Sequence, residues 1–327
     1  MSQSGVWARF SFTILTGVFL LMVGCSNQAP STFSPEGVLV DNSVTAEEGI
    51  ITTLYYITRQ GGYMVPIKQK LCASDRPVRL TLGRLIGGLE ADDDLIAPIP
   101  AETQVRDLYI RDGIAYVDLS SEFVGNQAAD DRYAQWAVET LVQTITQFDN
   151  IDKVQLLING KVKEKMATGV DISEPLKPKE WLNPLDDGTD GQMVLLYFDY
   201  RGKYLVPISR SVGLLTESLS RTALEELIKG PQGLVGLNSV VPDNVHLLNY
   251  RVEQETAYID LDLGEVGEDA DNWDESRALR SMLFTLQEFP HIHNVQLLVR
   301  GKIVGYLNGR PDLGNTQAFL EVNLMGN

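Results

Sequence analysis

The chain has 327 residues, enough for roughly two domains, and its 44 acidic and 27 basic residues give a formal net charge of −17. This charge argues against binding to nucleic acid, which requires a basic surface, and against a polybasic contact with anionic lipid.

The N-terminus has the features of a lipoprotein signal peptide. Arg9 precedes an apolar run at residues 10–23, which is short for a spanning helix but suits a signal-peptide core. The run ends in "LMVGC", which resembles a lipobox, and this resemblance implies that Cys25 becomes the lipidated N-terminus. The alternative is an uncleaved anchor helix in which Cys25 has no role. In either case we expect the remainder at the extracytoplasmic face of the cell membrane.

The other cysteine, Cys72, has no disulfide partner once Cys25 is acylated. We therefore expect Cys72 to be a small buried hydrophobic residue.

One phrase occurs twice, as "GGYMVPI" at residues 61–67 and "GKYLVPI" at residues 202–208. Extending the alignment at the same offset of 141 matches "LYYITRQGGYMVPI" with "LLYFDYRGKYLVPI" at seven of fourteen positions. "AYVDLS" then matches "AYIDLD", and "KVQLLINGK" matches "NVQLLVRGK". A repeat of this length indicates a duplicated domain rather than a solenoid.

Each copy has the same predicted order of elements. Two strands flank a glycine turn, a helix follows, then two more strands, a second helix and a last strand. Asp112-Gly113 favours a tight type I′ turn between the second pair of strands, whereas Gln254-Glu255 predicts a different turn in the second copy. The second helix of the first copy carries an apolar stripe, comprising Tyr133, Trp136, Ala137, Leu141, Ile145 and Phe148.

The predicted fold class is α+β: two tandem homologous domains, each with a small, mostly antiparallel sheet and two helices on one face. The predicted boundaries are a signal peptide with its lipobox cysteine at 1–25, a flexible tether at 26–49, a first domain at 50–165, a linker at 166–192, a second domain at 193–309 and a C-terminal tail at 310–327. A short strand is expected within the tail, at residues 318–324.

Candidate chemical groups are few. His291 and His293 would point the same way on an extended segment, as in a metal pair, but the first copy has Asn150 and Asp152 there, so exposed turn histidines are favoured. Asp118 and Asp260 end equivalent strands, where a carboxylate can accept backbone N–H bonds from the following turn or act as a catalytic acid. The structural cap is favoured, because the copies share no partner group.

The acidic runs at residues 90–94 and 268–275 do not match the spacing of a calcium loop and are interpreted as solvated charge. No nucleophile elbow, phosphate loop or zinc-protease motif is present. The sequence therefore predicts no catalytic, cofactor-binding or metal-binding residue.

Several segments resemble the GerM-domain family of extracytoplasmic bacterial lipoproteins. They are "LIKGP" at residues 227–231, "DGIAYVDLSSEF" at 112–123, "TLQEFPHIHNVQLLVRGK" at 285–302 and the repeated "Y-[ML]-VPI" strand. The resemblance covers residues 53–161 and 194–302, and tandem copies behind a lipobox are similar to sporulation and germination lipoproteins of this family.

The resemblance implies a fold like the ring-building motif, no enzyme activity and no cofactor. It implies a lipid-anchored scaffold on the mother-cell membrane, facing the space towards the forespore, where it would help a channel or engulfment complex to assemble. Its partners would be the membrane, envelope or sporulation-channel proteins, and further copies of itself within a larger complex. The alternatives are a lipoprotein that modulates an envelope sensor kinase and a protein of cell-wall metabolism. The expected contact face is polar, comprising Arg132, Gln135 and Glu139, or Arg277 and Arg280.

Overall fold

The computed structural model describes residues 49–89, 92–125, 131–186, 191–214, 218–239, 241, 245–262, 264, 275–303, 317–318 and 324–325. Cys25, the predicted signal peptide and nearly all of the predicted tether therefore lie outside the described residues. Residues 46–327 form one compact unit.

The described residues of the first repeat form six strands and three helices: β1 (Ile50–Thr58), β2 (Met64–Leu71), α1 (Pro77–Gly87), β3 (Leu95–Ile96), β4 (Val105–Arg111), β5 (Ile114–Leu119), α2 (Glu122–Gly125), α3 (Asp131–Ile145) and β6 (Lys153–Ile158). The second repeat follows the same order, except that its described residues include no counterpart of α2 and add the strand β13: β7 (Gln192–Tyr200), β8 (Tyr204–Val212), α4 (Leu219–Ile228), β9 (Leu237–Asn238), β10 (His246–Glu253), β11 (Thr256–Asp262), α5 (Glu275–Gln287), β12 (Asn294–Val299) and β13 (Lys302–Ile303).

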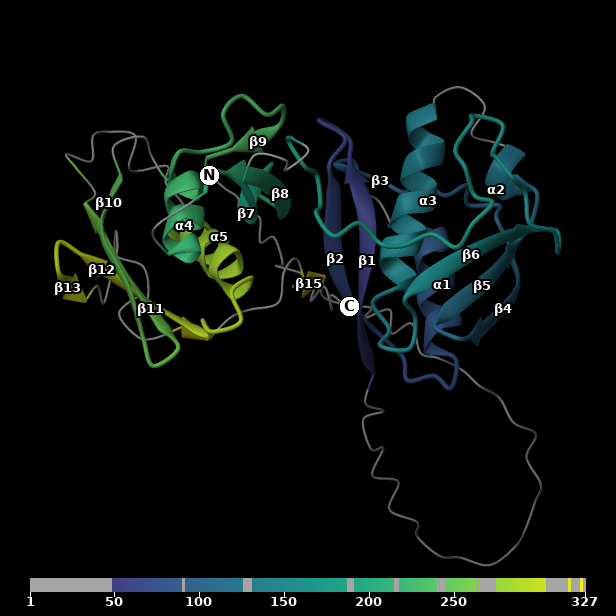
Figure 1. The fold of residues 1–327 in the computed structure, drawn as a ribbon, viewed down its shortest axis with the longest axis horizontal. Coiled ribbons are helices and arrows are strands. Elements are labelled where there is room, and N and C mark those ends of the chain that lie inside the picture. Colours follow the sequence, from purple (N-terminus) through teal and green to yellow (C-terminus); the bar gives the residue numbers. More distant parts are fainter. Residues whose placement is uncertain are drawn as a thin grey trace, which may run out of the picture. The chain divides into compact units, whose positions relative to one another are not determined.

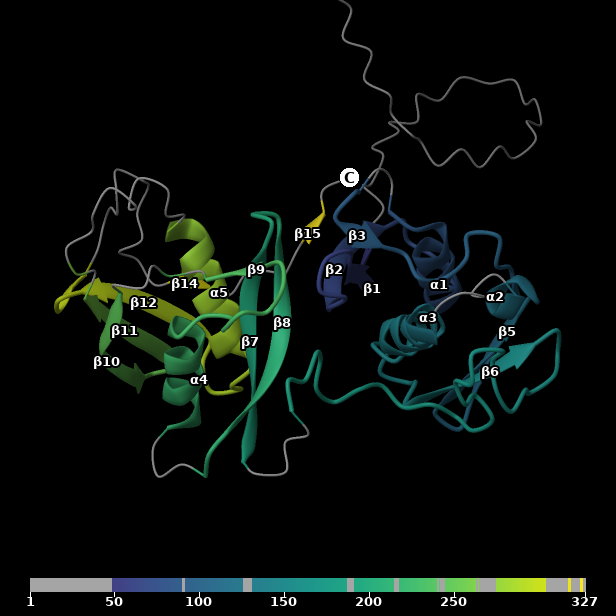
Figure 2. The same ribbon diagram turned by 90° about the horizontal axis from the view of Figure 1, so that it is seen from above.

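The α+β class, the tandem organisation and the mostly antiparallel pairing are confirmed, but the strands of each repeat divide between two sheets. In the first repeat, β1, β2 and β3 form one sheet, and β4, β5 and β6 form another. Helices α1 and α3 lie between the two sheets (Figures 1 and 2). Because α3 buries residues on a wide face, from Ala134 to Ile145, it can pack against β1 and β6 at once.

Among the described strands within each repeat, one parallel pairing sets the position of the second helix. Strands β5 and β6 are parallel neighbours, as are β11 and β12. A parallel connection needs a crossover, which α3 provides in the first repeat and α5 in the second.

Polar side chains on the second helix of each repeat, or just after it, bond the open edge of the first strand. Gln147 bonds both the N–H and the carbonyl of Thr53, at 2.7 Å each, and the Thr144 hydroxyl accepts the Tyr55 N–H at 3.2 Å. In the second repeat, Thr285 accepts the Tyr197 N–H at 3.2 Å. Buried backbone groups must find partners, which explains polar residues inside these helices.

The first hairpins of the two repeats differ by one residue in register. Leu54 pairs with Ile67, whereas Leu196, not Leu195, pairs with Ile208. The offset is therefore 142 before the turn and 141 after it, and the sequence alignment of the first strand at 141 is wrong. The first repeat accommodates the extra residue in its turn, and Leu54 and Leu196 are both fully buried.

The second pair of strands meets at the same turn in both repeats. Asp112 and Gly113 have φ angles of 51° and 74°, as the type I′ prediction requires. Gln254 and Glu255 have φ angles of 46° and 63°, so the expected different turn is wrong. The Glu255 carbonyl accepts the N–H groups of His293 and Asn294, at 2.9 and 3.1 Å, which holds the turn in this geometry.

The described part of the linker packs against the repeats. Ile172 is fully buried, and its carbonyl accepts a bond from the Gln155 side chain at 3.2 Å. Leu176 pairs with Val154 beside β6. In the tail, β14 (Gln317–Ala318) pairs with β12, and β15 (Leu324–Met325) pairs with β2.

Candidate functional site: the junction of the two repeats

The repeated aspartates are structural caps. Asp118 accepts the Gly160 N–H at 2.7 Å, and Asp260 accepts the Gly301 N–H at 2.8 Å. The donor lies in the turn after the parallel neighbouring strand, not in the turn after the aspartate's own strand as the sequence suggested. Each carboxylate therefore fastens the end of one strand to the end of the next.

The histidine pair is exposed, as expected. The nearest charged group to His293 is Glu255, with 3.6 Å between Nδ1 and Oε2. His291 lies beside the Phe289 ring, with centroids 6.4 Å apart. Within the described ranges, no group of three or more His, Cys, Asp or Glu residues is placed to hold a metal ion.

Cys72 is exposed, so the prediction of a buried residue is wrong. It follows directly after β2 ends at Leu71, where the chain leaves the sheet towards α1. The lipidation prediction for Cys25 falls outside the described residues. Across the described ranges, no helix is both long and apolar enough to cross a membrane.

The polar helix faces expected to meet partners are partly engaged within the chain. Glu139 accepts a bond from Gln135 at 2.8 Å and pairs with Lys179 of the linker at 2.7 Å. Arg277 pairs with the buried Asp199 of β7 at 3.0 Å. The Lys179 pair joins α3 to the linker, and the Arg277 pair joins α5 to β7 of its own repeat.

Arg132 lies over the Trp136 ring, 5.8 Å from its centroid, and Arg280 borders a small surface depression. Tyr133, expected in the apolar stripe, is 39% exposed, whereas Ala137, Leu141 and Ile145 are fully buried.

The repeated phrase places one tyrosine at the junction from each side. The junction comprises residues 60–63 and 92–94 of the first repeat and residues 200–204 and 234–236 of the second. Tyr63 and Tyr204 occupy equivalent positions at the start of β2 and β8. The Tyr204 hydroxyl donates to Asp92, and the Tyr63 hydroxyl bonds to the backbone of Val235. Each tyrosine thus reaches the loop before the third strand of the other repeat.

The Asp92 carboxylate serves both repeats. Its Oδ1 accepts the N–H groups of Asp94 and Leu95, at 2.9 and 3.2 Å, which shapes its own loop. Its Oδ2 accepts Lys203 Nζ at 2.7 Å and the Tyr204 hydroxyl. Its side chain is 5% exposed.

Burial alone would raise the pKa of Asp92, but the bonds from Lys203, Tyr204 and the Asp94 N–H lower it below its ordinary value. The hydrogen bond to Asp92 raises the pKa of Lys203. Burial, with the hydrogen bond to Asp92, raises the pKa of Tyr204 to about 12. The charged Asp92–Lys203 pair beside a neutral tyrosine is therefore the stable arrangement near neutral pH.

Tyr200 makes a second polar contact between the repeats. Its side chain is fully buried. Its hydroxyl accepts the Gln60 N–H at 3.1 Å and donates to the Asp94 carbonyl at 3.2 Å. Arg201 adds a bond to the Gln60 side chain at 3.2 Å and lies 3.5 Å from the Asp94 carboxylate.

Asn183 of the linker bridges one strand from each repeat. Its Oδ1 accepts the Met64 N–H at 2.7 Å, and its Nδ2 donates to the carbonyls of Met64 and Pro207, at 2.8 and 2.7 Å. Its φ of 48° is left-handed, a conformation that asparagine tolerates better than most residues. One amide therefore completes the edges of both β2 and β8.

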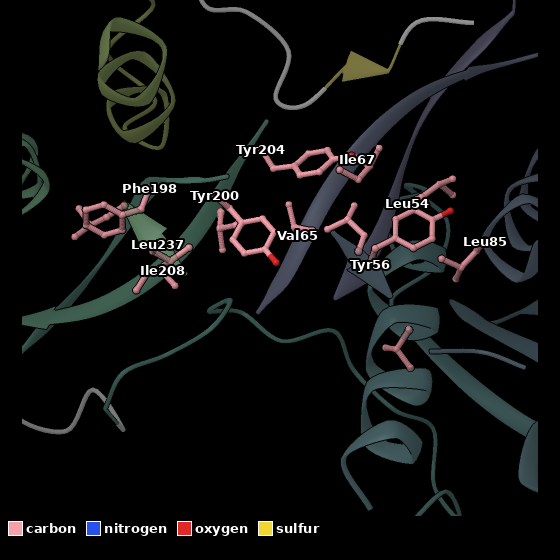
Figure 3. Close-up of a cluster of buried hydrophobic side chains, with 14 of the residues drawn as sticks. Leu54, Tyr56, Val65, Ile67, Leu85, Phe198, Tyr200, Tyr204, Ile208 and Leu237 are labelled. Atoms are coloured by element: carbon pink, nitrogen blue, oxygen red, sulfur yellow. The ribbon is translucent and has the colours of Figure 1, made fainter. Parts of the chain in front are cut away.

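Apolar side chains fill the space behind these polar groups. Figure 3 shows Tyr200 beside Val65 and Tyr204 beside Ile67, and all four belong to one buried cluster. The junction thus combines an apolar centre with a polar periphery, as protein interfaces do. The sequence pointed to the tyrosine phrase but not to Asp92, whose run was interpreted as solvated charge.

The family described as "Germane: Sporulation and spore germination" matches residues 53–164 and 195–305, one match in each repeat. The chain belongs to the Germane family. The resemblance to GerM domains is thereby confirmed.

A relative of this Germane chain, matched both by its sequence and by a solved structure, contains both repeats. The spore germination protein GerM of Bacillus subtilis (strain 168) is 28% identical over 272 residues, which cover 79% of this chain and 73% of the relative. The solved tandem GerMN domains of the sporulation protein GerM from Bacillus subtilis superimpose with a TM-score of 0.63 at 26% identity. That match covers 85% of this chain and all of the solved one, so the tandem α+β architecture is shared.

Proposed function

We propose that this Germane protein is a non-enzymatic, lipid-anchored scaffold that acts in sporulation and prepares the spore for germination. The observation that carries the proposal is the match of both repeats to a tandem sporulation protein. The roles of the polar residues also support the proposal. In the described part of the chain, the repeated aspartates cap strands, and Asp92 bonds the second repeat at the junction.

In this proposal, the lipid anchor at Cys25 determines where in the cell the protein acts. Lipidation of Cys25 would hold residues 50–309 outside the cytoplasm, at the mother-cell membrane facing the forespore. There, exposed surfaces of two fused domains can bind channel or engulfment proteins side by side. No cofactor is needed for such a role.

The test is a deletion strain complemented with wild type or with Cys25→Ala. We expect normal vegetative growth, a large loss of heat-resistant spores on deletion, and poor rescue by Cys25→Ala despite normal protein levels. Cys72→Ala is the matched control and should rescue fully. Failure of vegetative growth or envelope integrity would contradict the sporulation role and favour an envelope regulator instead.

A further inference from the structure

We propose that the junction is a recognition interface specific for one first repeat and one second repeat, and that it makes the tandem a single rigid body. This goes beyond the scaffold role, because it concerns how the chain recognises itself. The partner that the surface fits is the complementary repeat, from the same chain or from a second copy.

The first argument is reciprocity. Tyr63 contacts the loop at Val235, and its equivalent Tyr204 contacts the loop at Asp92. Each repeat offers the same two elements, a hairpin turn and the loop before the third strand. A reciprocal contact of this kind closes on itself, so it pairs two domains and leaves no end to which a third could add.

The second argument is the distribution of charge. The two carboxylates that pair with cations of the second repeat, Asp92 and Asp94, lie in the first repeat, where the second has Leu234 and Gly236. The cations Arg201 and Lys203 lie in the turn of the second repeat, and Lys203 stands where the first has Gly62.

This distribution selects one pairing out of three. Two first repeats would bring Asp92 to Gly62, which has no cation in the place of Lys203, while Arg59 of that turn is already bonded to the Asp93 and Leu95 carbonyls of its own repeat. Two second repeats would bring Lys203 to a loop with no carboxylate. A mismatched pair would also leave charged groups desolvated without partners. Only the pairing of a first with a second repeat matches both sets.

The third argument is burial. Tyr200 occupies the position of Thr58, yet Thr58 bonds to Gln60 of its own turn at 2.9 Å, whereas Tyr200 bonds to the other repeat. The Asp92 side chain is 5% exposed and takes two of its four bonds from the second repeat. These groups fulfil their bonding only when the repeats are docked.

The test uses residues 46–327, the compact unit, with a protease site in place of residues 187–190. After cleavage of the folded protein, we expect the two halves to remain associated, as measured by sedimentation and by dilution in a fluorescence assay. Lys203→Met and Arg201→Gln should each raise the Kd between the halves at least tenfold. Lys177→Met, an exposed lysine outside the junction, is the matched control and should leave the Kd unchanged.

A charge exchange separates recognition from misfolding. Asp94→Arg and Arg201→Asp should each weaken association, and the double variant should recover part of it, because the pair of positions 94 and 201 is restored with opposite polarity while Lys203, 3.7 Å from Asp94, then faces a cation. Circular dichroism of each variant shows whether the halves remain folded.

Dissociation of the wild-type halves on cleavage, a Kd that does not respond to Lys203→Met, or equally tight self-association of the first half would each overturn the proposal. The association experiment does not measure spore formation. A result that overturns the junction proposal would therefore leave the proposed scaffold role in sporulation unaffected.

Discussion

At the scale of single residues, one carboxylate often joins two elements of this fold. Asp118 and Asp260 each link parallel strands through a glycine N–H, and Asp92 links its own loop to the other repeat. A carboxylate that bonds backbone N–H groups gains more than a neutral acceptor would. These aspartates are explained by structure without any catalytic step.

Replacement of Asp118 tests its role as a cap. Asp118→Ala removes the acceptor of the Gly160 N–H and the Arg106 contact at 3.4 Å. We expect the free energy of unfolding of the first repeat to fall by about 1–2 kcal/mol, measured by urea denaturation. Asp118→Asn keeps an acceptor oxygen and should lose less. Equal stability of wild type and Asp118→Ala would contradict the cap.

The sequence predicted these two aspartates as caps but could not identify the donor. Gly160 lies 42 residues beyond Asp118 in the chain. The sequence shows a strand end and a glycine, but only the parallel pairing of β5 with β6 brings them together. The prediction that Cys72 is buried was wrong for a similar reason, because the exposure of Cys72 depends on where β2 ends rather than on its residue type.

At the scale of elements, repeated sequence is a good guide to the order of strands and helices and a poor guide to register. The "VPI" phrase placed β2 and β8 correctly, yet the preceding strands slipped by one residue because the two turns differ in length. The identity of Tyr56 and Tyr197 led the sequence alignment to pair these two residues. In the structure Tyr56 is equivalent to Phe198 instead, because these two side chains occupy the same inward position and are both fully buried.

The turn of the second repeat tests how far tertiary contacts override local preference. Gln254 and Glu255 hold left-handed conformations that favour asparagine and glycine. We expect the pair Gln254→Asn and Glu255→Gly to raise the free energy of unfolding by about 1–2 kcal/mol, because strain of roughly that size is relieved.

The opposite substitution is the natural control. At Gly113, an added Cβ would lie 2.5 Å from the Asp152 carboxylate, so Gly113→Glu should destabilise the first repeat. Denaturant unfolding of both variants measures the difference. A variant with Gln254→Asn and Glu255→Gly that is less stable than wild type would contradict this prediction. It would mean that the side chains of Gln254 and Glu255 stabilise the fold by more than the backbone strain of the turn costs.

At the scale of the whole molecule, the two repeats have similar folds but present different surfaces to each other at the junction. Both repeats retain the same buried framework, while the turn and loop at the junction have diverged in charge. If the junction is rigid, it fixes the relation between the two outward sheets, β4–β6 and β10–β12. A scaffold with two fixed faces can hold two partners at a defined spacing, which a flexible linker would not do.

Docking of the repeats should depend on pH with a sign set by Asp92. Its pKa is lowered from 3.8 in the docked state, so the stabilisation is present above that value and is lost as the pH falls below it. The pKa values of Lys203 and Tyr204 are raised, so their contributions are present at lower pH and are lost above their ordinary values of 10.5 and 10.0.

Lys203 of the second repeat pairs with Asp92 directly, and Asp94 of the same loop lies 3.7 Å from Lys203 and 3.5 Å from Arg201. The Kd between cleaved halves should therefore be constant between about pH 5 and 9 and rise outside that window. Asp92→Asn should raise the Kd on the plateau and flatten the acidic limb, because no carboxylate remains there to be protonated. An acidic limb that persists in Asp92→Asn while both halves remain folded would show that another carboxylate controls docking.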